Sequence, residues 1–210
     1  MRSVLITGGH GGLGTAVTAA FGAAGWHVVA PTRQEADFFD PASAQRAARE
    51  AAAAAPLGAV VTLVGGFAAG GRVHETPIED FEQQLRVNLR PTYLTCQAAI
   101  PHLLAAGGGS IVCVSSRTAL RPFPGAAGYV TAKAGVLALV DALDVEYAKD
   151  GIRTNAVVPS MIDTPANRAS MPDASRKDWV QPEAIASTIL FLASDESSSI
   201  SGAHIPVHHA

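Results

Sequence analysis

The chain has 210 residues, a length typical of one domain, and a formal net charge of -3 at pH 7. Hydrophobic residues make up 48% of the sequence and charged residues 16%, which excludes a long disordered charged tail. A charge balance this close to neutral argues against nucleic acid and anionic membrane surfaces as the main partners.

Short apolar runs alternate along the chain with longer segments of helical pattern. The runs are continuously apolar, which is typical of parallel strands covered by helices on both faces. We therefore predict an α/β fold in which residues 1–210 form a single Rossmann-type domain. Its doubly wound parallel sheet is expected to have about seven strands, with helices on both faces. The predicted strands are residues 4–6, 26–30, 37–39, 59–64, 111–114, 153–158 and 204–207.

Two segments between these strands carry specific signals. Thr76, Pro77 and Glu79 form a capping-box pattern at the start of a helix, and Pro91 predicts a kink further along that helix. Residues 163–180 are polar and lack periodicity, which predicts a loop and a candidate substrate lid. The other predicted helices are residues 13–24, 42–55, 127–147 and 183–193.

Residues 51–71 and 91–116 are uncharged stretches of membrane-span length, but proline and glycine interrupt both and would leave backbone groups unsatisfied in lipid. Cys96 and Cys113 lie in apolar stretches without zinc-site spacing, as expected of buried thiols in a reducing compartment. We therefore predict a cytoplasmic protein without membrane contact. No metal site is predicted, because the tail histidines 208–209 are expected to be solvated.

A glycine-rich turn, residues 7–14, lies between the first predicted strand and the first predicted helix. Glycines at such a turn let the backbone approach a pyrophosphate, which the free N–H groups of the helix N-terminus then face. A tight turn without a ligand is the alternative. The residues of this turn that we expect to bind a dinucleotide are Thr7, Gly8, His10, Gly12, Leu13 and Gly14.

The end of the second strand bears on the choice of dinucleotide. In dinucleotide folds an acidic residue at this place holds the adenosine ribose, but this chain has Thr32 followed by Arg33. A guanidinium suits a phosphate, so Arg33 favours NADP(H) over NAD(H). The alternative is that Arg33 is an ordinary surface arginine.

Four polar side chains form a candidate proton-transfer set. Tyr129 and Lys133 are four residues apart on a helix and share one face, and Ser116 follows the fifth predicted strand at its carboxyl end. Asn88 precedes the expected kink. A nearby ammonium is expected to lower the pKa of the Tyr129 phenol, while Ser116 holds a carbonyl oxygen. Each pattern also occurs by chance, but together they follow a glycine turn in one βαβ pattern.

The order of these motifs resembles the short-chain dehydrogenase/reductase family over essentially the whole chain. The resemblance implies an oxidoreductase in which Ser116, and not Ser115, takes the serine role. It also implies that Lys133 grips the nicotinamide ribose and that Asn88 supports a water in a proton relay. A homodimer or homotetramer is implied, paired through the helices around Asn88 and Tyr129. By the same resemblance, the further cofactor residues are Asp37 beside the adenine, Gly65 after the fourth strand, and Pro159, Ile162 and Thr164 at the carboxamide.

Two segments, residues 64–71 and 163–172, also resemble quinoid dihydropteridine reductases. Those enzymes carry an acid at the position of Thr32, prefer NADH and lack equivalents of Ser116 and Asn88, all of which sets this chain apart. The sequence therefore favours an NADP(H)-dependent enzyme acting on a small-molecule ketone or secondary alcohol. The alternatives are a dihydropteridine-reductase-like enzyme and a non-catalytic redox sensor.

The substrate itself is not specified by any of these patterns. Apolar side chains suited to a substrate pocket are equally suited to core or lid packing. We expect residues 163–180 to close over the substrate with Met171 or Trp179 meeting it, or else Trp179 anchors the loop. The candidate apolar residues are Phe67, Phe123, Met161, Met171 and Trp179.

Overall fold

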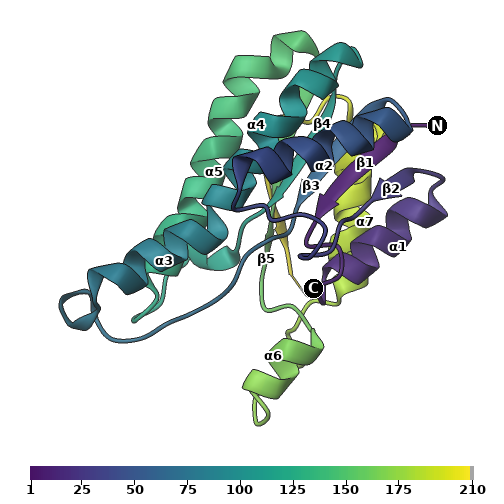
Figure 1. Ribbon diagram of the computed structural model, residues 1–210. Helices are drawn as coiled ribbons and strands as arrows, with labels where there is room; N and C mark the ends of the chain where they lie inside the picture. Colours follow the sequence, from purple (N-terminus) through teal and green to yellow (C-terminus); the bar gives the residue numbers. More distant parts are fainter. Residues whose placement is uncertain (209–210) are drawn as a thin grey trace.

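The computed structural model describes residues 1–208, which form one parallel sheet with helices on both faces (Figure 1). Each neighbouring pair of strands is parallel, and the strand order is β2-β1-β3-β4-β5-β6. The order runs outward from β1 in both directions, which confirms the doubly wound Rossmann-type topology. The strands are β1 (Ser3–Thr7), β2 (His27–Val29), β3 (Leu57–Thr62), β4 (Gly109–Val114), β5 (Ile152–Pro159) and β6 (His204–Val207).

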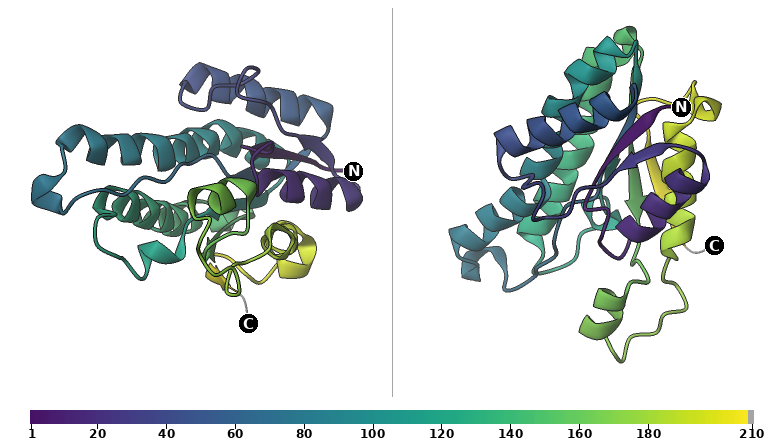
Figure 2. Two further views of the ribbon diagram at one scale, coloured as in Figure 1. Left: turned by 90° about the horizontal axis from the view of Figure 1, so that it is seen from below. Right: turned by 45° about the vertical axis from the view of Figure 1, so that its right-hand side comes forward.

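The helices divide between the two faces because strand side chains alternate. Leu5 points into a core shared with α2, α4 and α5, whereas its neighbours Val4 and Ile6 point into a second core shared with α1 and α7. Figure 2 shows the sheet between these two helix layers. The helices are α1 (Gly14–Ala23), α2 (Pro41–Ala54), α3 (Ile78–Asn88), α4 (Arg90–Ala105), α5 (Ala127–Tyr147), α6 (Pro165–Ser170) and α7 (Pro182–Ala193).

The sheet has six strands in the described part of the chain, so the predicted strand at residues 37–39 is wrong. The Asp37 N–H donates to the Ser43 hydroxyl at 2.9 Å, and the Phe39 N–H donates to the Asp37 carboxylate at 2.9 Å. Phe38 is buried in the α2 side of the core. Side chains have thus taken the backbone donors that a strand would need, and the segment forms a turn leading into α2.

The predicted kink near Pro91 is a complete break between α3 and α4. Leu89 separates the two helices, and Pro91 lies in the first turn of α4, where its missing N–H costs no hydrogen bond. The predicted cap of α3 is wrong, because the Thr76 hydroxyl donates to the carbonyls of Gly71 and Arg72 instead. Pro77 takes the capping position without a side-chain hydrogen bond.

The carboxyl ends of β1, β3, β4 and β5 meet at one edge of the sheet, from which α6 projects (Figure 1). Connections that leave this edge carry the glycine turn, the segment before α3, the Ser115–Ser116 pair and the 163–180 segment. Ligands of open α/β sheets bind at such an edge. None of the helices within residues 1–208 is both long enough and apolar enough to span a membrane.

Candidate active site

The glycine turn between β1 and α1 has no room for side chains at its closing point. The Gly11 N–H donates to the Gly8 carbonyl at 3.0 Å, and Gly8 has a φ of 72°, a conformation that favours glycine. A Cβ on Gly14 would collide with the same Gly8 carbonyl oxygen. The turn therefore presents bare backbone at the N-terminus of α1, which suits an anion such as a pyrophosphate.

Gly12 brings this turn into contact with the segment that follows β5. A Cβ on Gly12 would lie 2.8 Å from the Cβ of Thr164, so only glycine permits the approach. Thr164 caps α6 by accepting the Asn167 N–H at 3.3 Å, and Ile162 forms a bridge with Val180. The structure thereby joins two segments that the sequence assigns to the cofactor.

Three more predicted residues attach these segments to the sheet and to its core. Thr7 is buried, and its hydroxyl accepts the Leu63 N–H at 3.3 Å, which ties β1 to β3. Leu13 packs against the α1 side of the core, and Pro159 ends β5.

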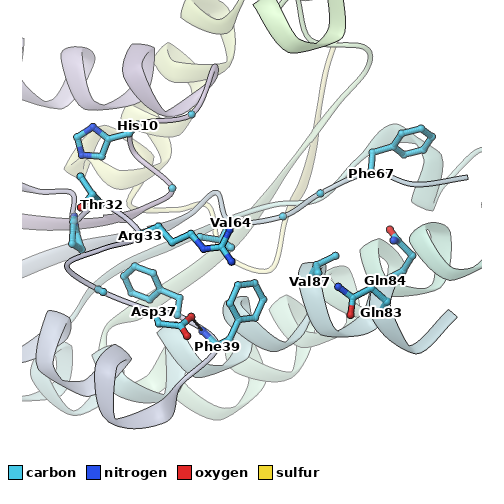
Figure 3. A pocket seen from close by; sticks show the side chains of 17 residues that line it. His10, Thr32, Arg33, Asp37, Phe39, Val64, Phe67, Gln83, Gln84 and Val87 are labelled. Carbon is cyan, nitrogen blue, oxygen red and sulfur yellow. Dashed lines mark hydrogen bonds between the residues drawn. The ribbon is translucent and has the colours of Figure 1, made fainter. Parts of the chain in front are cut away.

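A cavity of about 590 Å³ opens beside the glycine turn (Figure 3). His10, Thr32 and Arg33 lie on one side of it, and Gln83, Gln84 and Val87 of α3 lie on the other. The structure thus brings together predicted residues from three separate segments, and adds the α3 side chains, which the sequence does not single out. The predicted residues among those lining the cavity are Gly8, His10, Thr32, Arg33, Asp37 and Gly65.

Thr32 has a partner that the sequence analysis missed. Its backbone N–H and its hydroxyl both donate to the Glu35 carboxylate, at 2.8 and 2.9 Å, and its carbonyl accepts the N–H groups of Glu35 and Ala36. The two hydrogen bonds that the Glu35 carboxylate accepts from Thr32 hold its pKa below its usual range. The Thr-x-x-Glu spacing, a capping-box pattern, is the signal in the sequence that predicts this contact.

Asn88 connects the cavity to the proton-transfer set. Its amide donates to the Gly66 carbonyl at 2.8 Å and accepts the Gly66 N–H at 3.1 Å. A Cβ on Gly65 would lie 2.7 Å from the Asn88 Oδ1 and 3.4 Å from the Lys133 Nζ. Asn88 is fully buried and shapes the segment after β3, while its predicted role beside a relay water stays a prediction.

Tyr129 lies in the first turn of α5, with its ring edge-to-face against Phe67 at a centroid distance of 5.1 Å. Burial raises the pKa of the Tyr129 phenol, and a hydrogen bond with the Ser116 side chain acts in the opposite direction. The expected lowering by Lys133 is not found, since its Nζ lies 5.9 Å from the Tyr129 ring centroid and donates to the Val114 carbonyl at 3.0 Å. The phenol therefore keeps its proton at neutral pH.

Lys133 is buried one turn further along α5. Burial lowers the pKa of its ammonium to about 8. Ser115 donates to the Lys133 carbonyl at 2.8 Å and so serves the packing of α5 against β4. The Ser116 hydroxyl instead accepts a hydrogen bond from the Thr118 hydroxyl and lies beside the Tyr129 phenol.

The 163–180 segment is held by a charged clamp at its base. Arg168 donates twice to the Asp163 carboxylate, at 2.6 and 2.8 Å, and Gln181 donates to it at 3.0 Å. The Arg168 guanidinium holds the pKa of Asp163 at about 2. The segment is not all loop as predicted, because it contains α6, and Trp179 is buried as expected of an anchor.

Taken together, the carboxyl edge of the sheet offers an anion-binding turn, a cavity of about 590 Å³ and a protonated phenol beside a hydroxyl. Phe67 packs against Tyr129, Phe123 packs against Phe67, and the two phenylalanines are 61% and 42% exposed, so an apolar surface lies beside the phenol. Such an arrangement can bind a dinucleotide and deliver a proton to an adjacent substrate.

Known proteins resemble this chain in sequence and in fold. The family model described as Enoyl-(Acyl carrier protein) reductase matches residues 30–209. The chain is 33% identical to 2-(R)-hydroxypropyl-CoM dehydrogenase of Xanthobacter autotrophicus, over 96% of this chain and 95% of that protein. It is 32% identical to 2,5-dichloro-2,5-cyclohexadiene-1,4-diol dehydrogenase LinX of Sphingobium indicum, over 98% and 94%.

A solved structure described as ElxO with NADP bound superposes with a TM-score of 0.92 and 25% identity, covering 98% of this chain and 96% of that one. The family match and the relatives agree with the Rossmann-type fold described above. The chain therefore belongs to the short-chain dehydrogenase/reductase family of NAD(P)-dependent oxidoreductases.

Proposed function

We propose that this protein transfers a hydride between NADP(H) and a ketone or secondary alcohol, with Tyr129 passing the proton. The observation that carries the proposal is the protonated Tyr129 phenol, which stands beside the Ser116 hydroxyl and packs against Phe67, a residue that lines the cavity beside the glycine turn. Relatives named as dehydrogenases of an alcohol and of a diol support the substrate class.

The residues present fit a dinucleotide. Gly8, Gly12 and Gly14 bear no side chains because a Cβ there would meet Leu63, Thr164 or the backbone of the turn itself, so the turn offers bare backbone beside the cavity that Gly8 lines. When bound, the nicotinamide supplies the hydride. In our proposal Arg33 binds the 2'-phosphate and Lys133 holds the nicotinamide ribose. The proposed carboxamide contacts are Pro159, Ile162 and Thr164, and Asp37 is proposed to lie beside the adenine.

The proton step follows from the state of Tyr129. Since burial raises the pKa of the phenol, it carries the proton that a carbonyl oxygen needs on reduction. Ser116 positions that oxygen by donating a hydrogen bond. Alcohol oxidation requires the phenolate, so its rate is expected to rise as the solution becomes alkaline.

Replacing Tyr129 by Phe tests the assignment. The variant keeps the ring that packs against Phe67 but lacks the transferable proton. We expect turnover to fall by about 100- to 10,000-fold while NADPH affinity stays within twofold. Turnover is followed at the nicotinamide absorbance and affinity by titration calorimetry. Tyr147→Phe, at the far end of α5, is the matched control and should keep full activity.

A screen of ketones, alcohols and quinonoid dihydropterin with NADPH and NADH identifies the substrate. Turnover of the dihydropterin alone would favour the dihydropteridine-reductase alternative. Cofactor binding with no turnover of any substrate would favour a redox sensor. Unchanged ketone reduction by Tyr129→Phe would refute the proposed mechanism.

We also propose a cytoplasmic homodimer or homotetramer. Cys96 and Cys113 are free, buried thiols, which suits a reducing compartment. A groove between α3, α4 and α5, the helices around Asn88 and Tyr129, supports pairing of subunits on that face.

A further inference from the structure

The turn after β2 already holds a negative charge where the adenosine end of a dinucleotide is proposed to bind. Both free donors of Thr32, its N–H and its hydroxyl, are occupied by the Glu35 carboxylate at 2.8 and 2.9 Å. Thr32 and Arg33 line the cavity beside the glycine turn. Glu35 is exposed, so its side chain is free to rotate away.

Arg33 is placed differently from Thr32. Among residues 1–208 it has no acidic partner within ion-pair distance, and Figure 3 shows its side chain extending across the cavity. A guanidinium, a backbone N–H and a hydroxyl together are the donors that a phosphate monoester takes. A carboxylate on two of these donors occupies the place of that phosphate and repels it.

The same carboxylate suits a ribose that carries no phosphate. In dinucleotide folds an acid at the end of the second strand accepts hydrogen bonds from the ribose hydroxyls. The chain has no acid at position 32, but the two bonds from Thr32 bring the Glu35 carboxylate to that residue.

Resting on the proposed dinucleotide site, we infer that Glu35 is a specificity-determining residue that acts against Arg33. Glu35 holds the Thr32 donors in the free enzyme and disfavours the 2'-phosphate of NADPH, while it is compatible with the ribose of NADH. Binding of NADPH requires the carboxylate to leave Thr32, whereas binding of NADH does not.

Glu35→Gln tests the inference, because the amide keeps an oxygen acceptor for Thr32 and loses the charge. We expect the ratio of the NADH Kd to the NADPH Kd to rise about tenfold, mainly through tighter NADPH binding. Arg33→Ala should move the same ratio about tenfold in the opposite direction. Titration calorimetry of the unaltered protein and of both variants with each cofactor gives the six dissociation constants.

Two controls separate a charge effect from a change of the turn. Glu50→Gln removes an exposed carboxylate from α2 and should leave the ratio unchanged. Exposed charges are screened by salt, so the gain in NADPH affinity should shrink between about 0.05 and 0.5 M NaCl. A loss of turn structure would weaken both cofactors and would not follow the salt concentration.

The outcomes distinguish the inference from the proposed function. If the unaltered protein binds neither cofactor, the proposed function fails. If it binds NADPH and Arg33→Ala weakens that binding, but Glu35→Gln leaves the ratio unchanged, Glu35 only caps the turn and the inference is overturned.

Discussion

Lys133 places an ammonium where water is largely excluded. Only 7% of the residue surface is exposed, and its Nζ has one hydrogen-bond acceptor, the Val114 carbonyl, within residues 1–208. The lowering of its pKa to about 8 records what burial costs the charged form. The site therefore contains a charge that weakens the fold and that the proposed ribose contact requires.

Replacing Lys133 by Met removes this charge and keeps the length of the side chain. We expect the variant to lose activity and to gain about 1–3 kcal/mol in free energy of unfolding at pH 7. The folded pKa lies below the unfolded one, so the penalty is complete below pH 8 and fades as the pH rises towards about 10.

Urea unfolding of both proteins at pH 7 and at pH 10 measures the effect. Lys149→Met, which removes an exposed ammonium beyond the end of α5, is the control and should change stability little. A Lys133→Met protein that is less stable at pH 7 would contradict the expectation.

Some residues of the candidate site are predictable from their spacing in the sequence, whereas properties that depend on distant contacts are not. Tyr129 and Lys133 follow from helical spacing, and Arg33 from its place after a strand. The raised pKa of Tyr129 did not follow, because it depends on burial beside Phe67, a residue distant in sequence. Glu35 was detectable from its capping-box spacing with Thr32 but was not recognised.

At the scale of elements, the 163–180 segment is held in place by polar contacts. Asp163 joins Arg168 of α6 to Gln181, which caps α7, so one carboxylate connects both ends of the segment. With a pKa of about 2, it stays charged throughout the neutral and mildly acidic range. The clamp is thus lost only as the pH falls from about 4 towards 2.

Asp163→Asn breaks the ion pair and keeps the size of the side chain. We expect trypsin to cut the segment several-fold faster, at Arg168, Arg176 or Lys177, because α6 loses its main attachment. Gel analysis of the fragments at pH 8 follows the cleavage. Asp173→Asn, an exposed substitution in the same segment, is the control and should be cut by trypsin at the original rate. Equal cleavage rates for all three proteins would refute the clamp.

Elements were predictable where periodicity and end signals agreed. The six strands of the sheet follow from apolar runs, and Pro91 marks the place where α3 and α4 separate, although the sequence predicts only a kink there. The expected strand at residues 37–39 failed because Asp37 and Ser43 capture backbone N–H groups. The short α6 was missed, although Thr164 followed by proline is a helix-start signal.

For the whole molecule, the unpartnered face is the groove between α3, α4 and α5. It encloses about 1110 Å³ and includes Tyr93, which is half exposed, beside Leu89 and Leu139. Arg86 and Glu82 line the same groove, so apolar and charged groups lie together as in an interface between subunits.

We predict that Ala138→Arg disrupts assembly, because Ala138 is exposed in this groove and the long side chain blocks a partner helix. Light scattering should give a multiple of 21.5 kDa for the unaltered protein and 21.5 kDa for the variant. Ala53→Arg, on the exposed side of α2, is the control and should keep the oligomer. If the unaltered protein is a monomer, the prediction is wrong.

None of the six residues of α6 is buried, whereas Ser115 and Lys133 lie within the packed layers of the sheet and α5. Substitutions in α6 therefore leave the core intact, whereas a substitution of Lys133 changes the stability of the fold and the proposed chemistry together. Natural variation can accordingly explore new sequences in α6, which projects from the carboxyl edge of the sheet, at little risk to the fold. Descendants of this chain are expected to diversify in substrate through α6 while inheriting the sheet and its proton-transfer groups unaltered.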